Sequence, residues 1–178
     1  NLRYVERFVK FMLWSTGGFR IYLCGCDDIA AKLAEAYSAA GERAFDFGFV
    51  DDVYEKPLEV VACPEADFPA ANEAAKPIGG HKDGCRIGFD AGGSDRKVSA
   101  VIDGESVYSE EVVWYPKVTE DPTYHFNEIV TAFKTAASKM PRVDAIGVSS
   151  AGVYVDDCPM VASLFIKVPR ERRDEVKS

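Results

Sequence analysis

The stretch that decides the fold runs from Arg86 to Lys97 and reads Arg-Ile-Gly-Phe-Asp-Ala-Gly-Gly-Ser-Asp-Arg-Lys. An apolar run ends at Asp90, two glycines and a serine follow, and a second alternating run begins at Lys97. This pattern predicts two β-strands joined by a tight turn. Because glycine has no Cβ, backbone N–H groups in such a turn can approach phosphate oxygens closely. The stretch therefore predicts a phosphate-binding hairpin with a carboxylate on the last residue of its first strand.

The residues after the hairpin continue the sheet. The second strand, Lys97–Ile102, ends at Asp103-Gly104, which is the favoured pair for a two-residue hairpin turn. A third strand is predicted over Glu105–Ser109, with Val112–Tyr115 as an extension. Since both connections are short, the first three strands are expected to be antiparallel.

A helix and a fourth strand follow. Asp121 and Pro122 provide an N-cap and a first-turn proline, and Pro141 ends the helical spacing of apolar residues. Val143–Val148 is a continuous apolar run, which is typical of a strand buried on both faces. Because the helix makes a crossover, we expect this strand to be parallel to the first. The predicted fold class is α/β with a mixed sheet.

Residues 1–78 are predicted to form a separate small strand–helix–strand module of unknown role. The expected elements are a helix over Leu2–Trp14, a strand over Arg20–Cys24, a helix that begins at Asp27 and stops at Gly41, and strands over Phe45–Phe49 and Leu58–Ala62. A connector rich in proline and glycine, Pro64–Asp83, leads to the second predicted domain, residues 84–178.

Composition excludes several classes of protein. The chain has 178 residues, with 21 Lys plus Arg against 29 Asp plus Glu and a formal net charge of -8, which argues against a nucleic-acid-binding surface. The odd count of five cysteines indicates reduced thiols and a cytoplasmic location. No apolar segment is long enough to span a bilayer, so a membrane partner is not expected.

The order strand, strand, strand, helix, strand, with the acidic-glycine hairpin at its start, resembles half of the actin-like ATPase fold, which is ribonuclease H-like. Gly88–Ser94 resembles the first phosphate motif of the ROK family of sugar kinases and repressors, which runs acid, any residue, two glycines, then threonine or serine. Ile146–Gly152 is similar to the family's loop that borders the sugar cleft. The resemblance covers Cys85 to roughly Asp157. The chain departs from the motif at Asp95, where many members carry lysine.

The resemblance implies the N-terminal lobe of an ATP-dependent sugar kinase, which transfers the γ-phosphate of ATP to a sugar hydroxyl, with ATP and Mg²⁺ as cofactors. In that role Asp90 would hold Mg²⁺ through water. The N–H groups of Gly92, Gly93 and Ser94 would face the phosphates, and Lys97 would add positive charge. The alternative is a plain acidic hairpin in which the glycines serve only the turn.

The resemblance assigns Ser149, Ser150 and Gly152 to the sugar cleft, and a capped strand-to-loop transition is the alternative interpretation. The catalytic residues of such kinases are expected beyond Ser178. The expected partners are therefore a sugar and a C-terminal lobe of the same protein, and a homo-oligomer is compatible with the sequence. Exposed apolar surface is expected where the lobes meet. Two other functions stay open: a catalytically inactive sugar- or nucleotide-sensing regulator of the same fold, and an ATPase activator from another branch of the superfamily.

Overall fold

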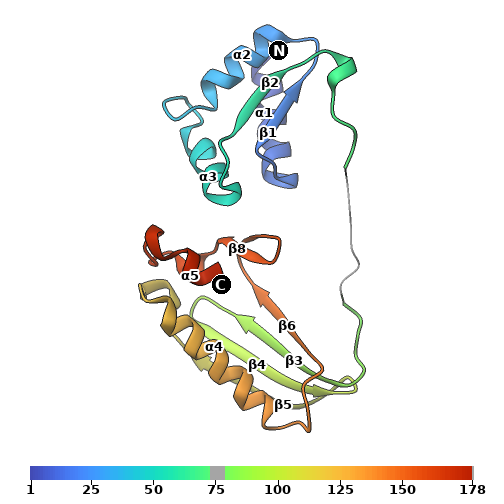
Figure 1. Cartoon of the computed structure of the whole chain (residues 1–178), viewed down its shortest axis with the longest axis vertical. Coiled ribbons are helices and arrows are strands. Elements are labelled where there is room, and N and C mark those ends of the chain that lie inside the picture. The colour runs from blue at the N-terminus through green and yellow to red at the C-terminus, as the bar shows by residue number, and fades with distance from the viewer. Residues whose placement is uncertain (73–78, 178) are drawn as a thin grey trace. The chain divides into compact units, whose positions relative to one another are not determined.

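The computed structural model describes residues 1–72 and 79–177. The chain divides into two compact units, Asn1–Ala75 and Lys76–Ser178, which are described separately below (Figure 1). In the described part of the chain, no helix is long and apolar enough to cross a membrane. All five cysteines are free thiols.

The first unit packs helices against a pair of parallel strands. Its elements are α1 (Leu2–Thr16), β1 (Arg20–Leu23), α2 (Asp27–Ala36), α3 (Ala44–Tyr54), β2 (Glu59–Ala62) and a 3₁₀ turn, η1 (Glu65–Asp67). Strands β1 and β2 pair in parallel, with Arg20 opposite Glu59. The buried core comes from α1, the α2 region, α3 and the residue before β2, through Val9, Leu33, Tyr37, Val50 and Leu58.

The expected strand over Phe45–Phe49 is wrong, because these residues belong to helix α3. The alternation Phe-Asp-Phe-Gly-Phe suggested a strand, but the buried residues of α3 are Asp46, Val50 and Val53, which lie at helical spacing. Asp46 can be buried because its carboxylate accepts a hydrogen bond of 2.6 Å from the indole of Trp14. Two helices, rather than one, therefore separate β1 from β2.

Helix α2 is shorter than expected, since it ends at Ala36 and not at Gly41. Gly41 still has a structural role, because a Cβ at this position would lie 2.2 Å from the carbonyl oxygen of Ala36. The chain therefore folds back on the end of the helix, and only glycine allows this close approach.

The second unit is built on a four-stranded mixed sheet. Its elements are β3 (Cys85–Ala91), β4 (Asp95–Ile102), β5 (Glu105–Val113), η2 (Pro116–Val118), α4 (Pro122–Ala137), β6 (Ala145–Ser150), β7 (Val153–Val155), β8 (Cys158–Val161), η3 (Ser163–Phe165), η4 (Arg170–Arg172) and α5 (Asp174–Lys177). The strand order is β5-β4-β3-β6, with β3–β4 and β4–β5 antiparallel and β6 parallel to β3. This confirms the predicted mixed sheet, in which the first three strands are antiparallel and the fourth is parallel to the first.

Local signals fix the ends of these elements. Asp103 and Gly104 form the β4–β5 turn with φ angles of 48° and 89°, the positive values that a two-residue hairpin of this type requires. At the start of α4 the Asp121 side chain accepts a hydrogen bond from Thr123 N at 3.1 Å, and Pro122 occupies the first turn. Both predictions are confirmed.

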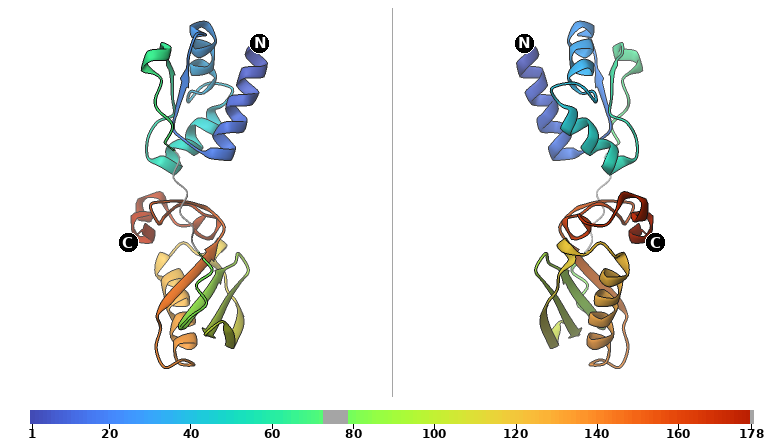
Figure 2. Two further views of the ribbon diagram at one scale, coloured as in Figure 1. Left: turned by 90° about the vertical axis from the view of Figure 1, so that its right-hand side faces the viewer. Right: turned by 90° about the vertical axis from the view of Figure 1, so that its left-hand side faces the viewer.

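Helix α4 covers one face of the sheet (Figures 1 and 2). It contacts β3 and β4, and the alternate β3 residues Cys85, Ile87, Phe89 and Ala91 are buried in the core on that side. The ring of Phe89 packs edge-on against Phe133 of α4, with centroids 5.3 Å apart. The β3 residues that alternate with these buried ones, including Gly88 and Asp90, lie on the face of the sheet away from α4.

The prediction that Val143–Val148 forms a strand buried on both faces is wrong. Strand β6 begins at Ala145, and all of its residues except Ser150 are exposed. The side chains of Ile146 and Val148 are 45% and 62% exposed, because β6 is an edge strand and α4 lies over β3 and β4 instead. The second unit thus shows exposed apolar side chains on a sheet edge.

Candidate functional site

The glycine turn connects β3 to β4 as predicted. Ala91, and not Asp90, is the last residue of β3, and Gly92, Gly93 and Ser94 form the connection. Neither glycine has a positive φ angle, so the turn needs them for space rather than for backbone conformation. A Cβ at Gly92 would lie 2.4 Å from the carbonyl oxygen of Asp95, which no side chain could tolerate without a shift of the backbone.

Trp114 is hydrogen-bonded to the backbone of the turn. Its indole N–H donates a 2.7 Å hydrogen bond to the carbonyl of Gly92, and its backbone N–H donates to the carbonyl of Ser94 at 3.2 Å. The side chain is 1% exposed and belongs to the core of the second unit. Because both bonds use carbonyl groups of the turn, they fix its backbone without occupying its N–H groups.

The amide groups of the turn are unused. Within the described residues, the N–H groups of Gly92, Gly93 and Ser94 donate no hydrogen bond to a protein acceptor. Successive backbone N–H groups in a turn can bind an anion when they point to a common side. The turn therefore has the free donors that a phosphate group requires.

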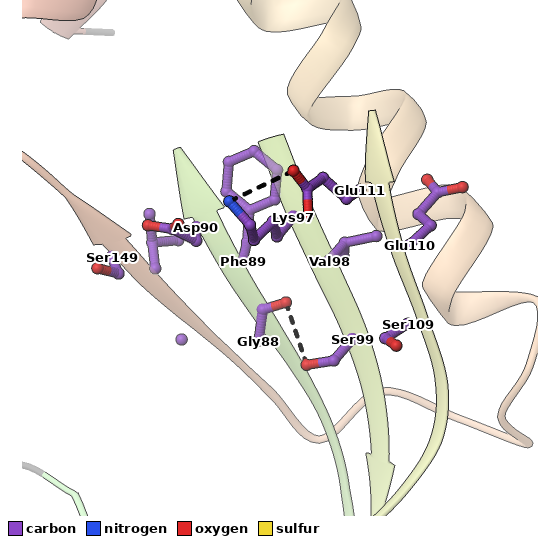
Figure 3. A pocket seen from close by; sticks show the side chains of 12 residues that line it. Gly88, Phe89, Asp90, Lys97, Val98, Ser99, Ser109, Glu110, Glu111 and Ser149 are labelled. Carbon is purple, nitrogen blue, oxygen red and sulfur yellow. Dashed lines mark hydrogen bonds and ion pairs between the residues drawn. The ribbon is translucent and has the colours of Figure 1, made fainter. Parts of the chain in front are cut away.

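Asp90 lies beside this turn, on the sheet face that α4 leaves uncovered. In the register of the sheet it stands between Lys97 of β4 and Ser149 of β6. Figure 3 shows these side chains on neighbouring strands, around an open hollow of about 620 Å³ that is also lined by Gly88, Ser99 and Glu111. The Asp90 carboxylate forms no ion pair with any described residue. The turn residues 92–94 do not line the hollow itself.

Lys97 is already paired with carboxylates. Its ammonium makes a short hydrogen bond to Asp95 and lies 3.9 Å from Glu111 (Figure 3). The bond to Lys97 lowers the pKa of the Asp95 carboxyl, and the same bond raises the pKa of the Lys97 ammonium. The positive charge of Lys97 is thus largely balanced within the protein.

The three residues expected at the sugar cleft have different surroundings. Ser149 pairs with Asp90 and lines the same hollow. Ser150 pairs with Ala91, and its buried hydroxyl oxygen has no hydrogen-bond partner among the described residues. Gly152 has a φ angle of 157°, and a Cβ there would lie 2.7 Å from the carbonyl oxygen of Val161. The structure therefore brings Ser149 to Asp90, while Gly152 is needed for packing.

One cation near the turn was missed by sequence reasoning. Lys117, on η2, crosses the turn so closely that a Cβ at Gly93 would lie 2.3 Å from its ammonium nitrogen. The phosphate motif does not include Lys117, which comes near the turn because β5 pairs with β4 as far as Val113 opposite Asp95 and because Trp114 is bonded to the turn.

The residues present fit a hydrated Mg²⁺ better than a directly ligated metal. The described residues contain no group of three or more His, Cys, Asp or Glu that could hold a metal ion. Mg²⁺, however, usually keeps several waters and binds through one or two carboxylates together with phosphates. The free carboxylate of Asp90 beside a row of free N–H groups meets that requirement.

Comparison with known proteins adds no constraint, because no family model, no curated protein and no solved structure matches this chain.

Proposed function

We propose that the second unit is the phosphate-binding lobe of an ATP-dependent sugar kinase with an actin-like ATPase fold. The observation that carries the proposal is the row of unpaired N–H groups at Gly92, Gly93 and Ser94, next to the unpaired carboxylate of Asp90. A turn that served only to reverse the chain would need neither feature.

The topology of the sheet supports this location. Because β3 and β6 are parallel, their carboxyl ends meet at one edge, and this edge holds Asp90, Ser149 and the glycine turn. Ligands of open α/β sheets bind at the carboxyl ends of parallel strands. The strand order β5-β4-β3-β6, with one helix as the crossover, is also the order expected for this lobe.

Each group has a defined part in the proposed reaction. Phosphoryl transfer depends mainly on positioning and on neutralisation of the developing charge. The turn would bind phosphate oxygens, and Asp90 would hold the waters of Mg²⁺, which bridges the phosphates. Ser149, on the neighbouring strand β6, would donate a hydrogen bond to a sugar hydroxyl or accept one from it.

A second candidate, a sensing regulator that binds nucleotide or sugar without transfer, is favoured by one observation. The lysine of the hairpin, Lys97, is balanced by Asp95 and Glu111, so the hairpin alone supplies little net positive charge. Phosphorus NMR of the full-length gene product with ATP and a panel of hexoses separates the two functions, because only a kinase forms a sugar phosphate.

Calorimetric titration of the chain with Mg·ATP tests the phosphate site directly. We expect Asp90→Asn to weaken binding about tenfold, which corresponds to about 1.4 kcal/mol. Asp157→Asn is the matched control: it makes the same charge change on an exposed turn where φ is 65°, a conformation that asparagine tolerates. Equal affinity of the two variants, or no binding by the parent chain, would contradict the proposed function.

A further inference from the structure

We propose that Lys117, and not Lys97, is the cation that contacts the ATP phosphates held by the glycine turn. This inference rests on the proposed function, since it assigns a further binding residue to the same site. It concerns a residue outside the hairpin, on the 3₁₀ turn η2.

The first support is the position of the Lys117 side chain. The ideal Cβ position of Gly93 lies 2.3 Å from both Cε and Nζ of Lys117. The end of this side chain therefore fills the space directly over the middle residue of the turn. Its ammonium therefore lies beside the turn whose N–H groups would bind the phosphate.

The second support is the way the chain fixes this segment. Trp114, three residues before Lys117, is tied to the turn by two hydrogen bonds. The carbonyl of Pro116 lies 3.1 Å from Nε2 of the buried His125, and the Thr119 hydroxyl donates to the carbonyl of Tyr115 at 2.6 Å. Hydrogen bonds thus fix the backbone on both sides of Lys117, and this backbone positions the Lys117 side chain at the turn.

The third support is the balance of charge. Around the turn, Asp90, Asp95 and Glu111 outnumber the single cation Lys97. A triphosphate would be repelled by this group unless another positive charge joined it. Lys117 is exposed and forms no ion pair with a described carboxylate, so its charge is available to the ligand. A charge-assisted hydrogen bond from an ammonium to a phosphate oxygen is among the stronger polar contacts in proteins.

The test is calorimetric titration of the chain with inorganic tripolyphosphate and with Mg·ATP at low ionic strength. Lys117→Met should weaken the binding of both about tenfold, the loss expected for one charge-assisted hydrogen bond. Lys97→Met should weaken binding less than Lys117→Met does, because Lys97 acts by balancing Asp95 and Glu111 and not through a bond to the ligand. Lys134→Met, an exposed site on α4 with no described ion pair, is the matched control and should bind as the parent chain does.

Two further measurements make the result decisive. Lys117→Arg should keep most of the affinity because it keeps the charge, and amide NMR spectra of each variant should match the parent away from the turn. If the parent chain binds, Asp90→Asn weakens binding and Lys117→Met does not, the inference about Lys117 is overturned while the proposed function stands. If the parent chain binds neither probe, both are overturned.

Discussion

Replacement of Trp114 by phenylalanine tests whether the core supports the glycine turn. The change removes the 2.7 Å bond from the indole N–H to the carbonyl of Gly92, while the backbone bond from residue 114 to Ser94 is kept. Loss of one such hydrogen bond costs about 1 kcal/mol. The smaller ring in a site only 1% exposed adds about 1–2 kcal/mol. We therefore expect the free energy of unfolding of the second unit to fall by about 2–3 kcal/mol.

Native-state hydrogen exchange measures this change unit by unit. The most protected amides of β4 in the second unit should lose about 2–3 kcal/mol of protection, whereas those of α2 in the first unit should keep theirs. Trp14→Phe is the control, because it removes the indole bond from α1 to Asp46 of α3 and should lower protection in the first unit, α2 included, without changing β4. Unchanged protection of β4 in the Trp114 variant would refute the view that this indole anchors the turn.

Two further predictions concern the same unit. The hydrogen bond from Arg142 lowers the pKa of Asp144 below its usual 3.8, so the ionised carboxyl stabilises the fold above that pH, and its contribution is lost as the pH falls through the lowered pKa. In acid denaturation, the difference in stability between the parent and Asp144→Asn should therefore shrink as the pH falls through that range. A difference that stayed constant with pH would contradict this prediction. Gly152→Ala should lower the free energy of unfolding by about 1–3 kcal/mol, because the new Cβ would meet the carbonyl oxygen of Val161 at 2.7 Å; a thermal melt identical to that of the parent would refute this packing role.

The parts of the fold that the sequence predicts correctly are those that nearby residues determine. Asp103-Gly104 sets the β4–β5 turn because both residues adopt positive φ angles readily. Asp121 and Pro122 start α4 through a cap and a fixed φ angle. With those elements in place, a single helical crossover makes β6 parallel to β3, and this brings Ser149 beside Asp90.

The parts that the sequence predicts wrongly depend on tertiary contacts. Phe45–Phe49 alternates like a strand, but the burial of Asp46 against Trp14 and Lys10 favours a helix there. Ile146 and Val148 are apolar enough for a buried strand, yet α4 packs over β3 and β4 and leaves them exposed.

In the candidate site, too, some residues are placed by local sequence and others by tertiary contacts. Asp90 and the glycines are adjacent in sequence, so their motif predicts their arrangement. Lys117 lies 24 positions after Gly93 (117 − 93) and comes close to it because the β4–β5 pairing places Val113 opposite Asp95 and because the Trp114 indole is bonded to the turn. The approach of β5 to the turn follows from the predicted hairpin, but the position of Lys117 over Gly93 also depends on tertiary contacts of Trp114 that no motif indicates.

The most direct test of the central claim is an amide NMR titration of the ¹⁵N-labelled chain with Mg·ATP. If the turn binds phosphate, the largest shifts will fall on the N–H groups of Gly92, Gly93 and Ser94, and the amides of the first unit will stay in place. Saturable binding that leaves these three amides unshifted, or a titration that moves no amide at all, would contradict the account.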